Sequence, residues 1–245
     1  MKVCAVIPVY NHGEAVGAVV GGVRAQGLPC VLVDDGSEPG CAAVLDALAE
    51  GDRSGIELVR LPENQGKGGA MMAGLRAAKE RGFSHALQID ADGQHDTSDI
   101  PRFLRLAEQS PEKLICGTPV YDASVPKGRL YGRYATHIWV WINTLSFTIR
   151  DSMCGFRVYP LEPTVQLLDT VKLGKRMDFD VEVLVRLFWR GMGIVNNPTP
   201  VRYPSDGISH FDVFWDNVRI SRMHARLFLG MLVRLPLLLW RKVTA

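Results

Sequence analysis

The stretch His85-Ala86-Leu87-Gln88-Ile89-Asp90-Ala91-Asp92-Gly93-Gln94-His95 tells most about how this chain folds. Its first five residues are typical of a short buried strand, and two carboxylates follow that strand directly. The glycine after them indicates a turn. Oxygen ligands in such a turn suit Mg²⁺ or Mn²⁺, which bind few carboxylates and keep positions open for substrate phosphates. We therefore expect a metal-bound diphosphate at this turn.

Strands and helices alternate around this stretch in the first half of the chain. The predicted strands span 3–9, 29–33, 56–61 and 86–89, and the predicted helices span 11–26, 40–50 and 66–81. This alternation indicates βαβ units and a mainly parallel sheet, hence an α/β fold. Ligands of such sheets bind beyond the carboxyl ends of the strands. Two acidic pairs, Asp34 with Asp35 and Asp90 with Asp92, lie at such ends.

The second half of the chain is less regular. We predict a helix at 99–109, a strand at 113–116, an aromatic-rich helix at 131–149, a helix at 178–190 and a strand at 194–196. No linker or repeat separates the halves, so residues 1–210 are interpreted as one catalytic domain.

Residues 211–245 form a separate apolar and basic segment, in which Pro236 is expected to break or kink the helical pattern. Its arginines and lysine could reach lipid phosphates while the apolar side chains lie in the membrane interface. The alternative is a pair of helices packed on the domain or on a partner. The run 227–240 is expected to be too short and too charged to span a membrane.

Composition limits the remaining choices. The chain has 245 residues and a formal net charge of +2, which argues neither for nor against nucleic acid. Its five cysteines are scattered without a CxxC pair, so buried reduced thiols and a cytoplasmic protein are expected.

Three further motifs follow the predicted strands: Pro8-Val9-Tyr10-Asn11, Asp34-Asp35-Gly36-Ser37 and Glu63-Asn64-Gln65-Gly66-Lys67-Gly68-Gly69-Ala70. The tyrosine could stack on a nucleobase or simply pack. The acidic pair could accept hydrogen bonds from a ribose or base edge, or stabilise a turn. The glycines of the third motif allow close approach of backbone at a helix N-terminus. Its lysine could reach a diphosphate or remain in solvent.

In this order, and with Asp90-Ala91-Asp92-Gly93-Gln94-His95, the motifs resemble glycosyltransferase family 2, the inverting nucleotide-sugar enzymes of the GT-A fold. The last motif is similar to that of the dolichyl-phosphate mannosyltransferase-like branch. The resemblance implies a mixed, mainly parallel sheet flanked by helices with a Rossmann-like nucleotide-binding half, followed by C-terminal amphipathic helices. It implies Asp92 as the main metal ligand, assisted by Asp90 and Gln94. The implied donor-binding residues are Pro8, Tyr10, Asn11, Asp34, Asp35, Lys67, Asp90 and Ala91.

The second half carries weaker matches. Residues 151–157 resemble the branch's Asp-x-x-(Ser/Thr)-Gly-Phe-Arg, with Cys154 at the hydroxyl position. Asp180 stands where the family places a general base for hydroxyl acceptors; alternatively it only decorates a helix. Residues 203–210 resemble a closing loop in which Pro204 and His210 replace an arginine and a lysine. The acceptor or phosphate candidates are Arg129, Arg133, Asp151, Arg202, Ser209 and His210.

The leading hypothesis is a metal-dependent hexosyltransferase at the cytoplasmic face of the membrane. It would use a nucleoside-diphosphate sugar and a lipid-linked acceptor, with polyprenyl phosphate favoured and no nucleic acid as partner. Asp92 and Asp180 are the catalytic candidates, and the cofactor is Mg²⁺ or Mn²⁺. The alternatives are transfer to a lipophilic hydroxyl with Asp180 as base, a nucleotidyltransferase, and an inactive membrane-bound scaffold.

Overall fold

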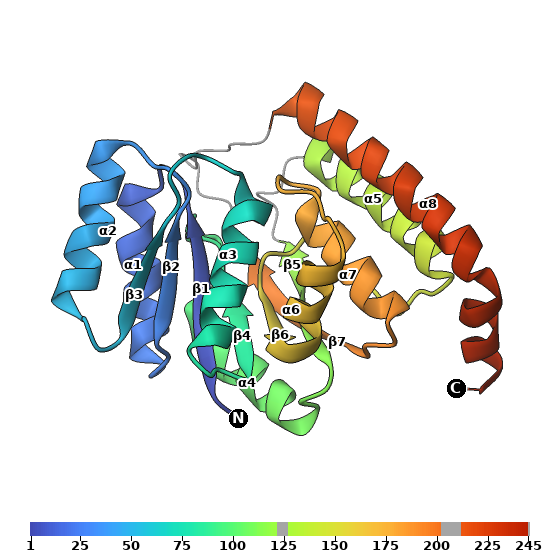
Figure 1. Cartoon of the computed structure of the whole chain (residues 1–245), viewed down its shortest axis with the longest axis horizontal. Coiled ribbons are helices and arrows are strands. Elements are labelled where there is room, and N and C mark those ends of the chain that lie inside the picture. Colours follow the sequence, from blue (N-terminus) through green and yellow to red (C-terminus); the bar gives the residue numbers. More distant parts are fainter. Residues whose placement is uncertain (122–126, 202–211, 245) are drawn as a thin grey trace.

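The computed structural model describes residues 1–121, 127–201 and 212–244, with the backbone alone for 127–129. Seven strands form one sheet in the order β3-β2-β1-β4-β6-β5-β7 (Figure 1). The strands are β1 (Val3–Val9), β2 (Cys30–Asp34), β3 (Ile56–Arg60), β4 (His85–Gln88), β5 (Leu114–Tyr121), β6 (Arg157–Pro160) and β7 (Ile194–Val201). Only β6 runs against its neighbours β4 and β5. The prediction of a mixed, mainly parallel sheet is confirmed.

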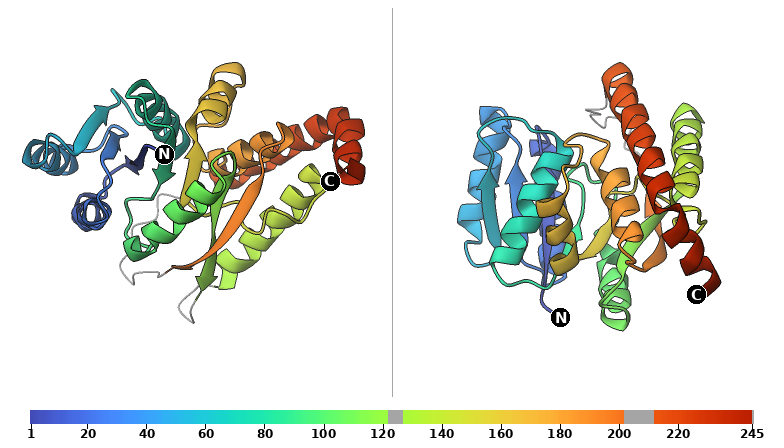
Figure 2. Two further views of the ribbon diagram at one scale, coloured as in Figure 1. Left: turned by 90° about the horizontal axis from the view of Figure 1, so that it is seen from below. Right: turned by 45° about the vertical axis from the view of Figure 1, so that its right-hand side comes forward.

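Helices cover both faces of the sheet (Figures 1 and 2). The helices are α1 (Gly13–Ala25), α2 (Pro39–Gly51), α3 (Lys67–Glu80), α4 (Ile100–Gln109), α5 (Lys127–Thr144), α6 (Leu161–Thr170), α7 (Phe179–Trp189) and α8 (Val213–Thr244), with a 3₁₀ turn at Thr97–Asp99. One apolar core lies under α1, α2 and α4, and the other lies under α3, α6 and α7. Strands buried on both faces need continuous apolar runs, which β1 and β2 supply.

The first half of the fold follows the prediction within two residues at each end. The second half differs more, because β6 and α6 were not predicted and β5 and β7 continue beyond their predicted ends. The aromatic helix also ends earlier than predicted, at Thr144, because Leu145 adopts a positive φ of 51°. All five cysteines are free and buried, as expected.

Helix α8 bears on two expectations about the C-terminal segment. The chain forms one helix from Val213 to Thr244 rather than two, and Pro236 lies inside it. The helix continues through the proline and its last turns change direction (Figure 1), so of the two expected effects the structure shows a kink and not a break. Among the described residues, α8 is the one helix long and apolar enough to cross a membrane by length and composition. The expectation that a charged run at 227–240 is too short to span did not cover the whole helix, which extends beyond that run at both ends.

Candidate active site

The acidic turn lies at the carboxyl edge of the sheet, directly after β4. One oxygen of Asp90, Oδ2, lies 2.7 Å from Nζ of Lys67, while its other oxygen, Oδ1, is buried and has no hydrogen-bond partner within the part of the chain that the structure describes. The Oδ1 atom of Asp92 accepts a hydrogen bond of 3.0 Å from the Gln94 backbone N–H. Burial, and then the negative charge of Asp90, raise the pKa of Asp92. Two close carboxylates with an unpartnered oxygen form a site that a cation would stabilise.

The donor set fits a divalent cation that also binds substrate. Among the described residues, no three or more His, Cys, Asp or Glu side chains gather as a closed metal site. Asp90 and Asp92 are the carboxylates that would hold such an ion, and Mg²⁺ sites with few protein carboxylates commonly keep positions for water and substrate phosphates. Gly155 leaves room for Asp90, since a Cβ at that position would collide with the Asp90 carboxylate. The roles of Asp90, Asp92 and Gln94 as metal ligands stay predictions.

Lys67, in the first turn of α3, lies between two carboxylates. Its ammonium contacts Asp90 at 2.7 Å and Asp180 at 2.8 Å, and its side chain is 16% exposed. Burial lowers the pKa of Lys67, but the charges of Asp180 and Asp90 outweigh burial and raise it. Lys67 therefore connects the acidic turn to α7. Its predicted contact with a diphosphate stays a prediction.

Asp180 is held on every side by polar groups. Its Oδ1 accepts a hydrogen bond of 3.0 Å from Nε2 of Gln88, and its Oδ2 lies 2.8 Å from Lys67. The Tyr159 hydroxyl donates to Oε1 of Gln88, and Arg157 donates to the Asp180 carbonyl. Burial raises the pKa of Asp180, but Lys67 and Arg157 together lower it below its usual value. Asp180 is therefore a charged, well-anchored carboxylate.

The two carboxylates at the end of β2, Asp34 and Asp35, hold loops at the nucleotide side. Asp35 accepts hydrogen bonds from the backbone N–H groups of Gln65 (2.7 Å) and Gly66 (2.8 Å) and from Asn64 Nδ2 (3.1 Å). Burial raises the pKa of Asp35. The buried Asp34 accepts from Arg60 and from the Ser37 backbone N–H, both at 2.9 Å.

The end of β1 is tied to the same loops. Asn11 has a positive φ of 55°, and its Oδ1 accepts from the Glu38 backbone N–H at 2.8 Å. Pro8 is in β1 and pairs with Val33 of β2. These contacts place Pro8, Tyr10, Asn11, Asp34 and Asp35 at one edge of the sheet. Their donor-binding roles, and that of the buried Ala91, stay predictions.

Of the acceptor candidates, Arg133 and Asp151 form a bidentate ion pair of 2.8 and 2.9 Å. Nε2 of His137 lies 3.2 Å from the same carboxylate. Burial raises the pKa of Asp151, but hydrogen bonds from His137 and the charge of Arg133 lower it overall. Arg133 is thus already neutralised. The Arg129 side chain, Arg202, Ser209 and His210 lie outside the described residues.

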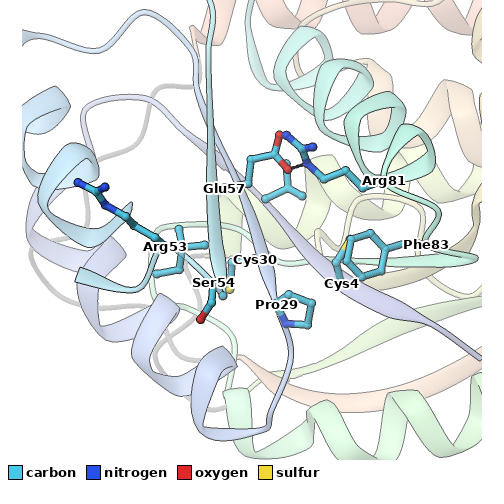
Figure 3. Close-up of a pocket in the computed structure, with 11 residues that line it drawn as sticks. Cys4, Pro29, Cys30, Arg53, Ser54, Glu57, Arg81 and Phe83 are labelled. Carbon is cyan, nitrogen blue, oxygen red and sulfur yellow. Dashed lines mark ion pairs between the residues drawn. The ribbon is translucent and has the colours of Figure 1, made fainter. Parts of the chain in front are cut away.

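A cavity of about 330 Å³ lies at the opposite, amino edge of the sheet (Figure 3). Cys4, Pro29 and Cys30 line it, and an ion pair joins Glu57 to Arg81 at its side. None of the predicted site residues lines this cavity.

Comparison with known proteins agrees with the geometry of the carboxyl edge. The model of the family "Glycosyl transferase family 2" matches residues 4–163, about two thirds of the chain. This chain belongs to glycosyltransferase family 2. The match includes the acidic turn and ends before α7, which carries Asp180.

Relatives of this family-2 chain include sugar transferases named for polyprenyl phosphates. The undecaprenyl-phosphate mannosyltransferase of Micrococcus luteus is 28% identical, with 81% of this chain and 82% of the relative covered. The polyprenol monophosphomannose synthase of Mycolicibacterium smegmatis is 26% identical, with 83% and 78% covered. A dolichyl-phosphate β-glucosyltransferase of Dictyostelium discoideum is 30% identical, with 63% and 49% covered.

Solved structures show the same fold. The glucosyl-3-phosphoglycerate synthase of Mycobacterium tuberculosis, solved with Mn²⁺ and UDP-glucose, superposes with a TM-score of 0.68 at 16% identity. The alignment covers 94% of this chain and 78% of the solved one. The GT-A expectation for this family-2 chain is therefore confirmed.

Sequence reasoning missed several residues of this family-2 site. Gln88 and Tyr159 are completely buried near Asp180, as is Arg157, which the motif at 151–157 already included without this contact. A glutamine within the otherwise apolar run 86–89 indicates a buried polar contact, so Gln88 could have been found from the sequence. The backbone that approaches the glycines at 66 and 68 was also not foreseen: a Cβ at either position would collide with residues 175–179.

Proposed function

We propose that this protein transfers a hexose from a nucleoside-diphosphate sugar to a polyprenyl phosphate, with inversion at the anomeric carbon. The observation that carries the proposal is the acidic pair after β4, where a buried oxygen of Asp90 has no hydrogen-bond partner among the described residues, and where burial and then the charge of Asp90 raise the pKa of Asp92. Family membership and the names of three relatives support it.

In this proposal, Asp90 and Asp92 would hold a divalent cation beside the donor. Such an ion, when bound, neutralises charge on the leaving nucleoside diphosphate. Lys67 fixes the orientation of Asp90, and the small Gly155 lets that carboxylate approach the backbone. Asp35 holds the loop 64–66, and so shapes the nucleotide side of the site. Positioning of this kind supplies a large part of the rate in a direct displacement.

A phosphate acceptor fits the surroundings of Asp180 better than a hydroxyl. A hydroxyl acceptor needs a general base that is free to take a proton. Both carboxylate oxygens of Asp180 are already engaged, by Gln88 and Lys67, and nearby cations lower its pKa. A phosphate is already anionic and needs no such base. We therefore assign Asp180 a positioning role toward Lys67.

The acceptor's lipid would meet the protein at α5 and α8, which lie side by side (Figure 1). Both helices expose large apolar side chains: Tyr131, Tyr134, Ile138 and Trp139 on α5, and Phe214, Trp215, Leu229, Leu232, Val233, Leu237 and Trp240 on α8. Arginines and one lysine interrupt the apolar run of α8. We propose that this face lies on the membrane surface. Only 28% of the most apolar 18-residue stretch of α8 is buried within the protein.

Donor binding is the most direct test of this proposal. Thermal unfolding is followed with GDP-, UDP- and dTDP-sugars, each with Mn²⁺ or Mg²⁺. Binding to the native state raises Tm, so at least one donor should raise it, and only with metal present. No shift with any donor would contradict the proposal.

A further inference from the structure

Residues 64–69, the loop before α3 together with the first residues of that helix, are called the donor loop here. The segment 173–178 lies against this donor loop, although the two are far apart in the sequence. The Lys175 carbonyl accepts a hydrogen bond of 2.9 Å from the Gly69 backbone N–H. Nζ of Lys175 donates to Oε1 of Gln65 at 2.7 Å, and the Arg176 guanidinium donates to Oδ1 of Asn64. Three contacts therefore join this segment to the loop that also binds Asp35.

The close approach requires the glycines of the donor loop. A Cβ at Gly66 would lie 2.7 Å from the Lys175 carbonyl oxygen, and one at Gly68 would lie 2.9 Å from the Lys175 carbonyl carbon. Gly66 also has a positive φ of 89°, which disfavours any other residue. These glycines thus provide space for the segment 173–178.

Glu182 of α7 anchors that segment. Its side chain is completely buried, and Oε2 accepts a hydrogen bond of 2.9 Å from the Gly174 backbone N–H. Oε1 accepts from Arg186 at 2.8 and 3.0 Å, and Oε2 also accepts from Arg226 of α8 at 3.1 Å. One buried carboxylate therefore joins α7, α8 and the segment that supports the donor loop.

We propose that Glu182 is a positioning residue for the donor site, and that it acts through the segment 173–178 on the loop 64–69. This inference rests on the proposed function, because it assigns the loop 64–69 to donor binding. Loss of the Glu182 anchor would free Gly174 and with it the supports at Lys175 and Arg176. The loop would then hold the nucleotide less firmly, while Asp92 keeps its hydrogen bond from the Gln94 backbone N–H.

Two variants and a control test the proposal. Glu182→Gln keeps the shape of the side chain but removes its charge. Arg176→Met removes both hydrogen bonds to Asn64 from an exposed position, so that it leaves the buried cluster and the folding of α7 intact. Lys172→Met is the control: Lys172 is exposed, and no hydrogen bond or ion pair of its side chain is seen within the described ranges. Lys172→Met removes the same charge from the residue just before the segment 173–178.

The readouts are hydrogen exchange of the peptide covering 64–70 in the full chain, and the Kd for UDP or GDP with Mn²⁺. We expect Glu182→Gln and Arg176→Met to speed exchange in this peptide and to weaken nucleotide binding about tenfold. Donor KM should rise by a similar factor while acceptor KM stays unchanged, and Lys172→Met should match the wild type. Unchanged exchange and Kd in Arg176→Met, with a wild type that binds nucleotide, would overturn the inference. A wild type that binds no nucleotide would contradict the proposed function instead, and the exchange result would still decide whether the anchor holds the loop.

Discussion

The ammonium of Lys67 lies 2.8 Å from Oδ2 of Asp180, and these two residues connect the start of α3 to the start of α7. Both side chains are nearly buried, at 16% and 7% exposed. The same ammonium contacts Asp90 at 2.7 Å, so one cation serves a carboxylate on each side. This arrangement makes Asp180 part of the scaffold of the site.

Replacing Lys67 with Met should destabilise the fold strongly. The change leaves two largely buried carboxylates without their shared cation, and removal of one partner of a buried pair costs about 3 to 5 kcal/mol. Urea unfolding measures the loss. Adding Asp180→Asn should recover part of it, because the second change removes one uncompensated charge. If the losses of unfolding free energy in the two single variants simply added in the double variant, the Lys67–Asp180 contact would be contradicted.

Replacing Asp92 with Asn should abolish transfer and stabilise the metal-free fold. The pKa of Asp92 is higher in the folded state than in the unfolded state, so the native state binds more protons at pH values between the two pKa values. The free energy of unfolding therefore falls as pH rises from the unfolded pKa to the folded one. Removing the charge removes that loss at pH 7. Mn²⁺ should raise the Tm of the wild type and have a smaller effect on Asp92→Asn. An equal metal response in both proteins would rule out Asp92 as a ligand.

His224 should make the fold sensitive to mild acid. His224 lies on α8, where its ring contacts Asn143 of α5. Burial lowers the pKa of His224 from 6.5 to about 4. Between these values the unfolded chain binds more protons than the native one, so the free energy of unfolding falls as pH drops from 6.5 to 4, by at most about 3 kcal/mol. In His224→Gln this part of the pH dependence should disappear. Identical slopes in both proteins would refute the assignment.

The exposed face of α8 should bind lipid vesicles. Leu229 and Val233 are 64% and 81% exposed and lie one helical turn apart. Changing both to Glu should reduce cosedimentation with anionic vesicles at least tenfold, because it removes apolar area and adds charge opposite to that of the nearby arginines. Glu162→Gln, on the exposed surface of α6, serves as the control. Unchanged binding of the double variant would exclude this face.

The sequence predicted the first half of the fold well because β1 and β2 are continuous apolar runs with turn residues after them. It missed β6, since a strand of four residues, Arg157–Pro160, shows no periodicity and carries a charge and a proline. The acidic turn could be located because its residues are adjacent. The Lys67–Asp180 contact and the Glu182 anchor could not, because they join residues that only tertiary folding brings together.

Transfer to a lipid phosphate tests the central claim most directly. The purified chain is incubated with the nucleotide sugar that raises its Tm, Mn²⁺, and either a polyprenyl phosphate or the matching polyprenol, and the sugar in the organic phase is measured. We predict transfer to the phosphate, no transfer to the alcohol, and none with Asp92→Asn. Transfer to the alcohol, or none to the phosphate in a chain that binds donor, would contradict the account.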